Sequence, residues 1–241
     1  RQPAEAREHA CPPVWREKIC EWCYQVVDHC DIDRGVVSIA LDYFDRFLSC
    51  QTSSSRAEIS FQLVSMTSLY LAAKLHSTRR ISASSMSSLS KGCFRVSEIL
   101  NMEVRIIQTL RWHLNPPTPS IYLDVVNPLL DASIADVQDS YEVSELSRYL
   151  LELGVCDSYF IEMNPSSIAY ASILIAMENL STSKEIRTKF DLYKLDKASK
   201  VTERCARRLR HVYQLTMMPD SQVEEEEPSR PIASPTSVLP V

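Results

Sequence analysis

Four charged residues lie within apolar helical segments of the sequence: Arg16, Asp45, Lys74 and Glu103. An unpaired buried charge is costly, so each of the four should have a partner of opposite sign or form charge-assisted hydrogen bonds to another protein. Two are positive and two are negative. The sequence is therefore compatible with two internal salt bridges, or with one internal pair and one pair that contacts a partner.

The side-chain patterns of common enzymes are missing from the sequence. The five histidines (9, 29, 76, 113 and 211) form no HExxH motif, and no GxSxG motif is present. Cys20 and Cys23 form a CxxC pair, but no second pair follows at zinc-ligand spacing. We therefore expect this pair to pack in the core. We expect no catalytic residue, no metal and no cofactor, and so a protein that is not an enzyme.

A basic run near the C-terminus comprises Arg204, Arg207, Arg208 and Arg210. It is compatible with a phosphate contact or a nuclear-import signal. The arginines alternate with Glu203 and with apolar residues at helical spacing, which favours a solvated helix face. Residues 218–241 hold five acidic residues against one arginine, so the remainder of this −5 chain is nearly neutral. This charge balance disfavours broad nucleic-acid binding.

The elements that carry these residues are expected to be helices. The 241 residues include only three glycines, well below the average of about 7%. Glycine-rich nucleotide loops are excluded, and a sheet protein would need more turn glycines. Eight dispersed cysteines indicate a reducing compartment, and no apolar run approaches the roughly 18 residues of a membrane helix.

Apolar spacing predicts five helices in the first half of the chain. We expect them over 15–27, 36–48, 55–75, 83–89 and 96–112. Asp33 is a candidate N-cap for the second, and Ser55 with Glu58 forms a capping box for the third. The prolines of 115–119 then break the helical pattern and mark a boundary.

The second half repeats this plan after Pro119. We expect a helix that begins with Thr118 as N-cap and Pro119 as its first residue, then helices over 141–154, 166–180 and 196–216, with a further capping box at 182–185. The most apolar helix of each half contains a similar segment, 67–72 and 171–176, which suggests an internal repeat. The predicted organisation is an arm (1–11), two domains (12–114 and 120–217) joined by the linker 115–119, and a disordered tail (218–241).

These residues resemble the cyclin box. The resemblance rests on Leu41-Asp-Tyr-Phe-Asp-Arg-Phe-Leu48, Leu71-Ala-Ala-Lys74, Met102-Glu103, Leu110-Arg-Trp-His-Leu114 and the prolines that follow. The family's five-residue pattern is matched in full by Arg16, Asp45, Leu63, Lys74 and Glu103. The resemblance covers about 12–216, is stronger over the first half, and is most similar to D-type or G1 cyclins.

The resemblance implies an all-α protein of two tandem five-helix boxes. It implies a regulatory subunit that binds and activates a cyclin-dependent serine/threonine kinase in the nucleus and cytoplasm, with a role in G1. Arg16 and Asp45 would form an internal salt bridge, whereas Lys74 and Glu103 would contact the kinase beside its C-helix. Leu75 and Trp112 match apolar positions of that contact surface.

The resemblance also implies a groove that docks Arg-x-Leu peptides of substrates or inhibitors. The matching positions are Trp15, Ile19, Trp22, Gln25 and Gln62. Lys18 stands where an isoleucine is usual, and Gln25 where a glutamate receives the peptide's arginine. We therefore expect weak or altered docking. The competing interpretation is that Trp15 and Trp22 simply pack between the two domains.

Ser234, followed by Pro235, is a minimal proline-directed phosphorylation site in a tail that resembles a degradation signal. The alternatives to a cell-cycle cyclin are a transcription-type cyclin and a cyclin-fold general transcription factor. The second of these would need a zinc ribbon and a basic DNA-facing surface, and the sequence contains neither.

Overall fold

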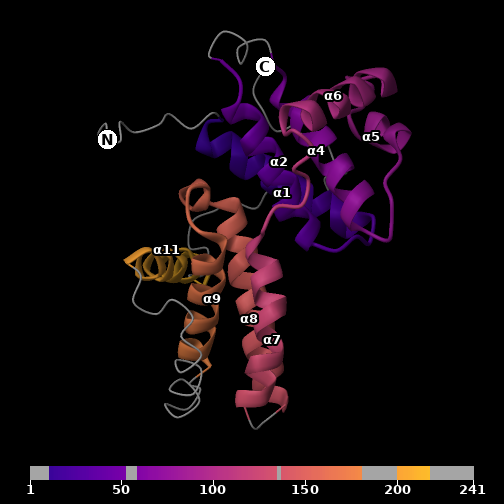
Figure 1. The fold of residues 1–241 in the computed structure, drawn as a ribbon. Coiled ribbons are helices and arrows are strands. Elements are labelled where there is room, and N and C mark those ends of the chain that lie inside the picture. The colour runs from indigo at the N-terminus through magenta and orange to yellow at the C-terminus, as the bar shows by residue number, and fades with distance from the viewer. Residues whose placement is uncertain (1–10, 53–58, 135–136, 181–199, 218–241) are drawn as a thin grey trace, which may run out of the picture. The chain divides into compact units, whose positions relative to one another are not determined.

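The chain is all-helical in a computed structural model that describes residues 11–52, 59–134, 137–180 and 200–217. These residues form nine α-helices and one short 3-10 helix, with no strand among them (Figure 1). The helical prediction is confirmed. Its physical basis is the scarcity of glycine together with apolar residues at helical spacing.

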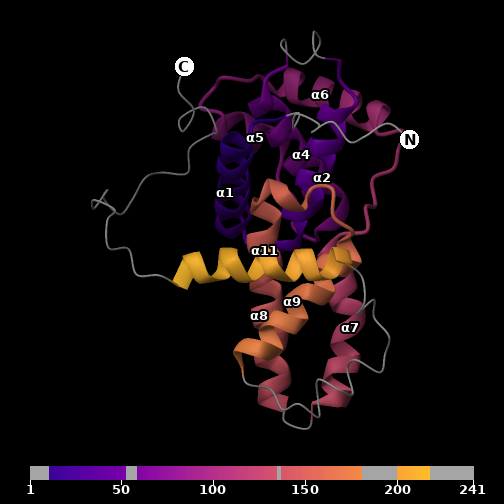
Figure 2. The ribbon, with the colours of Figure 1, turned by 90° about the vertical axis from the view of Figure 1, so that its left-hand side faces the viewer.

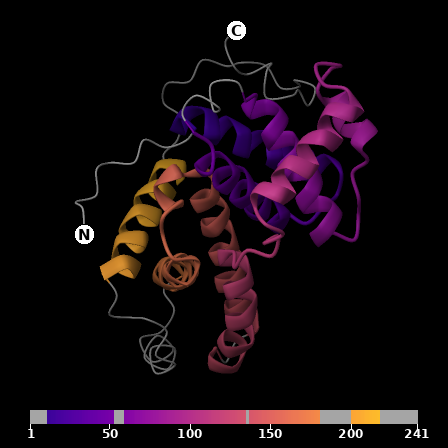
Figure 3. The ribbon, with the colours of Figure 1, turned by 45° about the horizontal axis from the view of Figure 1, so that its top comes forward.

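The chain divides into two compact units, one ending at Pro116 and the next beginning at Pro117. The first unit contains α1 (Pro13–His29), α2 (Gly35–Ser49), α4 (Phe61–His76), α5 (Ala83–Leu89) and α6 (Val96–Thr109). Helix α4 is its centre and packs against the other four. Figures 1 and 3 show α5 and α6 next to one another within this unit.

Helix α4 can be central because it presents small or apolar side chains in every direction. Its buried residues include Ser65, Thr67, Ser68, Ala72 and Ala73, which let neighbouring helices approach closely. The largest side chains of this core come mainly from α2, where Tyr43, Phe44 and Phe47 are fully buried. The first unit therefore has a hydrophobic core of its own.

Short side chains at helix starts fix several boundaries. Ser60 and Ser82 are N-caps whose hydroxyls accept hydrogen bonds from the backbone N–H of Leu63 and Ser85. Asp33 accepts a hydrogen bond from the N–H of Gly35 at 2.6 Å, although the N-cap position itself is Arg34. The described part of the third expected helix starts at Phe61, and the predicted capping box at 55–58 lies outside the described residues.

Helix α6 ends earlier than the sequence pattern predicts. We expected it to continue to Trp112, but its last residue is Thr109 and its C-cap is Leu110. Arg111 and Trp112 have φ values of 51° and 62°, in the left-handed region. The chain therefore turns out of the helix before the prolines are reached, so the prediction of the helix end was wrong.

The second unit contains α7 (Pro119–Ser133), α8 (Val137–Cys156), the 3-10 helix η1 (Ser158–Phe160), α9 (Pro165–Asn179) and α11 (Lys200–Met217). Helix α9 is central and packs against α7, α8 and α11. Figure 2 shows α11 running across α8 and α9. Pro119 and Pro165 each occupy the first turn of a helix, where proline is favoured.

The core of the second unit is a cluster of apolar side chains from all four α-helices. Leu123, Leu150, Ile173, Cys205 and Leu209 are fully buried in it. The two segments of the expected repeat thus lie in α4 and α9, the central helices of their units. The capping box expected at 182–185 and the tail from 218 lie outside the described residues.

Candidate partner-binding site

Lys74 and Glu103 form an ion pair between α4 and α6. The Lys74 ammonium donates a hydrogen bond to Glu103 Oε1 at 2.8 Å. The Glu103 side chain is only 9% exposed, whereas that of Lys74 is 44% exposed. The hydrogen bond to Glu103 raises the pKa of Lys74. At neutral pH a buried carboxylate is therefore compensated by an ammonium group that stays open to solvent.

Exposed apolar side chains accompany this pair. Leu75 follows Lys74 directly, Val104 follows Glu103, and Leu100 precedes Glu103 by three residues on the same helix; all three are exposed. Residues three and four apart on a helix are neighbours on its surface, so Leu100 is a neighbour of both Glu103 and Val104. A charged pair bordered by solvent-exposed aliphatic side chains is the composition expected of a protein-binding surface.

Leu100 and Val104 were missed as site residues by sequence reasoning. Its apolar character and its spacing from Glu103 place Leu100 in the apolar helical stripe around Glu103, but the buried side of α6 consists of Ile99, Met102, Glu103 and Ile106. Leu100 lies 40% exposed. The spacing of Leu100 and Val104, four residues apart, is the signal in the sequence that identifies a second apolar face.

Trp112, a predicted apolar contact, is 76% exposed immediately after α6. The chain around it is held by side chains of α2 and α4. The Tyr43 hydroxyl donates a hydrogen bond to the Leu114 carbonyl oxygen, and His76 Nε2 lies 2.8 Å from the same oxygen and 2.9 Å from the Tyr43 hydroxyl. Burial raises the pKa of Tyr43, so its phenol remains protonated as a donor.

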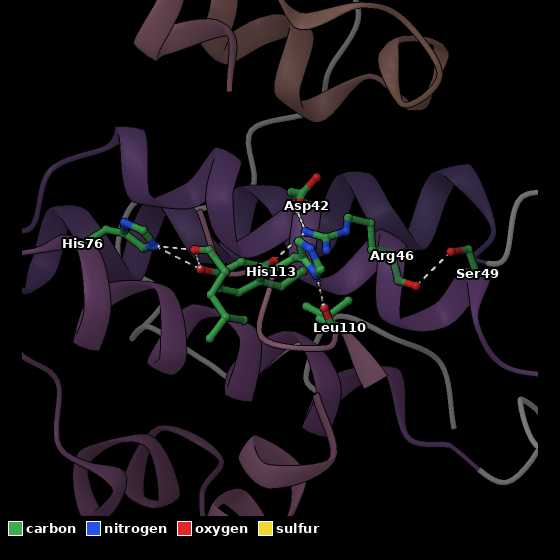
Figure 4. Close-up of polar contacts among 8 residues, drawn as sticks. Asp42, Arg46, Ser49, His76, Leu110 and His113 are labelled. Carbon is green, nitrogen blue, oxygen red and sulfur yellow. Dashed lines mark hydrogen bonds and ion pairs between the residues drawn. The ribbon is translucent and has the colours of Figure 1, made fainter. Parts of the chain in front are cut away.

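Arg46 holds the preceding carbonyl. Its guanidinium donates a hydrogen bond to the His113 carbonyl oxygen at 3.1 Å and pairs with Asp42 at 2.7 Å, so that Arg46 lies between these two residues in Figure 4. Burial raises the pKa of the Asp42 carboxyl, an effect that the hydrogen bond from Arg46 opposes. Two successive backbone carbonyls after Trp112 are thus fixed, which holds this exposed indole on an ordered turn.

Arg16 and Asp45 form a second ion pair, between α1 and α2. Arg16 Nε lies 3.1 Å from both carboxylate oxygens of Asp45, and Nη2 lies 2.9 Å from Oδ2. The exposed fractions are 6% and 16%, so both side chains are largely removed from solvent. Nearby, burial is the main cause that raises the pKa of the Cys11 thiol to about 12. This pair connects two helices and presents little surface to another molecule.

The residues of the expected peptide groove differ widely in exposure. Ile19, Trp22 and Gln62 are buried, Trp15 is half-buried with its ring edge against Phe61, and Gln25 is exposed. Trp22 Nε1 and Gln62 Nε2 are buried donors that lack a hydrogen-bond acceptor. A buried donor without an acceptor is unfavourable.

The basic run of α11 is extensively paired. Arg208 binds Asp157 and Arg210 binds Glu178, each at 2.6 Å, and Arg207 lies 3.4 Å from Glu203. Arg204 donates a hydrogen bond to the Tyr159 hydroxyl at 3.4 Å. These contacts favour the interpretation of this run as a salt-bridged helix face.

Other kinds of site find little support in the described part of the chain. No three His, Cys, Asp or Glu side chains in it are placed to hold a metal ion, and Cys20 and Cys23 are buried in the core of the first unit. Within the same residues, no helix combines the length and the apolar character needed to cross a membrane.

Comparisons with known proteins match both units. The family described as "Cyclin, N-terminal domain" matches residues 4–115, and "Cyclin, C-terminal domain" matches residues 117–225. G1/S-specific cyclin-D1 of Mus musculus is 25% identical over 169 residues, which is 70% of this chain and 55% of that protein. Cyclin-O of Homo sapiens is 26% identical over 187 residues, 77% of this chain and 51% of that protein. The chain thus spans little more than half the length of these relatives.

Solved structures share the fold. A viral cyclin from herpesvirus saimiri has a TM-score of 0.68 at 16% identity, covering 85% of this chain and 86% of that chain. The CAK complex of Chaetomium thermophilum bound to ATP-gamma-S contains a chain with a TM-score of 0.65 at 20% identity, covering 87% of this chain and 65% of that one. The yeast TFIIK complex (Kin28/Ccl1/Tfb3) contains a chain with a TM-score of 0.63 at 15% identity, covering 82% and 85%.

Proposed function

The chain belongs to the cyclin family, and from this premise we propose that it is a regulatory subunit that binds and activates a cyclin-dependent serine/threonine kinase. One observation carries the proposal: the Lys74–Glu103 pair lies partly open to solvent and is bordered by exposed Leu75, Leu100 and Val104. Solved relatives of the same fold come from kinase-containing complexes such as CAK, which supports this type of partner.

The physical role of the pair is to offer charged hydrogen-bonding groups on an apolar surface. Such groups bind backbone or side-chain partners strongly when an interface excludes water. The surface would hold the kinase's C-helix in its inward position, where the kinase's own Lys–Glu pair forms and its activation loop is ordered. The chain would thus act by binding the active kinase conformation more tightly than the inactive one, without chemistry of its own.

A variant with exchanged charges distinguishes a kinase-binding role of the Lys74–Glu103 pair from the role of an internal salt bridge alone. In Lys74→Glu/Glu103→Lys the two side chains can still pair with each other, but the charges presented to a partner are exchanged. We expect the helical content and melting temperature to change little, and kinase binding and activation to fall on the order of 100-fold. The measurement is titration of a purified cyclin-dependent kinase, followed by its activity on a peptide substrate.

The matched control exchanges another exposed ion pair, Glu203→Arg/Arg207→Glu on α11, and should leave binding unchanged. Lys74→Ala/Glu103→Ala should lose kinase binding as the swap does. Full activation of the kinase by a folded swap variant would show that the pair has only a structural role, and the proposal would be withdrawn.

The cell-cycle role and the class of cyclin are proposed from the relatives of the chain and not from the geometry of the site. Similarity to G1/S-specific cyclin-D1 supports a cell-cycle role in G1. Action in the nucleus and cytoplasm is proposed from the resemblance of the sequence to cyclins. Similarity to chains of CAK and TFIIK supports the transcription-type alternative. Identification by mass spectrometry of the kinase that co-purifies with the full chain from its natural source distinguishes the two.

The surface of α1 is proposed as a docking site for Arg-x-Leu peptides. The positions that remain open on this surface, exposed Gln25 and half-buried Trp15, support this second role, whereas Ile19, Trp22 and Gln62 are buried beneath it. Lys18 and Gln25 make the site less apolar and less acidic than is usual in the family. Docking is therefore proposed to be weak.

A further inference from the structure

Two adjacent arginines precede a serine in the segment that connects α4 to α5. The segment reads Arg79-Arg80-Ile81-Ser82, and the side chains of Arg79, Arg80 and Ser82 are exposed. The only other Arg-Arg pair in the sequence, 207–208, is followed by Leu209 and Arg210. Ser82 is therefore the only serine in the sequence with an arginine both two and three residues before it.

The backbone at Ser82 is extended, as in a substrate that a kinase binds in extended form, whereas Thr78 and Arg79 lie in a bend and Ile81 is buried. Residues 77–82 belong to no helix, and Ser82 itself is extended, with φ −81° and ψ 153°. Arg79 pairs with Asp31 at 2.9 Å, but the two side chains are 64% and 78% exposed. Such a surface ion pair contributes little free energy, so Arg79 can readily exchange Asp31 for another carboxylate.

The residues after Ser82 can also open locally. Helix α5 has seven residues, four of them serine, and Met86 is its only buried side chain. Serine is a weaker helix former than alanine or leucine, and a short helix with one buried residue is held by few contacts. Local opening of α5, which withdraws Met86 and the adjacent Ile81 from the core, would let a modifying enzyme reach both sides of Ser82.

We propose that Ser82 is a phosphorylation site for a serine kinase that recognises arginine two and three residues before its acceptor. The Ser82 hydroxyl oxygen attacks the γ-phosphorus of ATP, the bond from that phosphorus to the departing ADP oxygen breaks, and the hydroxyl proton passes to the kinase's general base. Carboxylates of that kinase would bind the guanidinium groups of Arg79 and Arg80.

Phosphorylation of Ser82 is compatible with the fold and would be carried out by a different kinase from the partner proposed above. Ser82 now accepts a hydrogen bond from the Ser85 N–H at 3.0 Å, and phosphate oxygens are strong acceptors that can replace its hydroxyl in this contact. Ser82 is followed by Ala83, so a proline-directed kinase would not accept it. The proposal therefore places this chain under the control of a second class of kinase and does not depend on its binding to the first.

The test uses the full chain, ATP and the purified catalytic subunit of cAMP-dependent protein kinase as an arginine-directed probe. We expect mass spectrometry to place phosphate on Ser82, and Ser82→Ala to remove it. Arg79→Gln/Arg80→Gln should lower kcat/KM for Ser82 at least about tenfold, because two charge-assisted contacts are lost. Circular dichroism verifies that each variant keeps its helical content.

Ser49 supplies a matched comparison. It is exposed and has an arginine, Arg46, three residues before it, but it lies within α2 and has no second arginine. Ser49→Ala should not change the extent of labelling. Absence of phosphate at Ser82 in the wild-type chain would overturn the proposal. So would equal labelling of Ser82 in the Arg79→Gln/Arg80→Gln variant, since recognition would then not involve the arginines.

Discussion

The two ion pairs of the first unit are chemically alike and differ in exposure. Arg16 and Asp45 bind through two guanidinium nitrogens and are largely shielded from solvent, whereas Lys74 donates to one oxygen of Glu103, lies 5.6 Å from the centre of the Tyr70 ring and is nearly half exposed. A shielded, bidentate pair satisfies its own charges. A pair with one exposed member has hydrogen-bonding capacity left for a partner.

Loss of one member of the shielded pair should destabilise the fold. We expect Arg16→Ala to lower the free energy of unfolding by roughly 3–5 kcal/mol, because it leaves the Asp45 carboxylate shielded and without its main counter-charge. Urea denaturation followed by circular dichroism measures the effect. Arg79→Ala, which removes a member of a solvent-exposed pair, should cost less than about 1 kcal/mol. Equal, small losses in the two variants would contradict the shielded role of Arg16.

At the scale of elements, α1 combines a buried side with a solvent-facing side that contains the expected peptide-docking residues. Ile19 and Trp22 contribute to the core, whereas Gln25 is open to solvent. Docking on this helix would depend on its few exposed positions, such as Gln25. The charge of those positions then determines which peptides bind.

Placing at position 25 the glutamate that is usual in the family should strengthen peptide docking. We expect Gln25→Glu to tighten binding of a synthetic Arg-x-Leu peptide roughly two- to fivefold, the gain of one solvent-exposed ion pair. Fluorescence titration of the labelled peptide at low salt gives the affinity, and added salt should reduce the gain. The control is Gln108→Glu, an exposed glutamine on α6. Wild-type affinity as high as that of the Gln25→Glu variant would contradict the proposal that docking is weak.

At the scale of the whole molecule, the proposed functions lie in one unit. Lys74, Glu103 and Trp112 all precede Pro117, and the first unit has its own core around α4. The second unit has a separate core around α9. Folding of the partner-binding surface should therefore depend mainly on the first unit.

A fragment of residues 1–116 should fold and bind the kinase. We expect helical circular dichroism with a cooperative melt and a kinase affinity within about tenfold of that of the full chain, because each unit buries its own apolar side chains. A fragment of residues 117–217 should not bind. A folded first fragment without kinase affinity would show that the second unit supplies essential contacts.

The helical class and many helix starts could be predicted from local sequence. Proline at 119 and 165 and serine at 82 act within one turn of the chain, so their effect is readable without tertiary contacts. The end of α6 could not be predicted in this way. Arg111 and Trp112 suit a helix by composition, but the carbonyls that follow them are bound by Tyr43 and Arg46, which come from far earlier in the sequence.

Composition and apolar spacing are enough to show that the chain is helical and that four charges within apolar segments need partners, and they suggest an internal repeat. Which charges meet, and how far each is exposed, depends on how the helices pack. Apolar spacing shows that a residue lies near a buried face, but exposure depends on which neighbouring helix covers it. That is why Leu100 and Glu103, three residues apart on α6, differ: Leu100 is open to solvent and Glu103 is buried against Lys74.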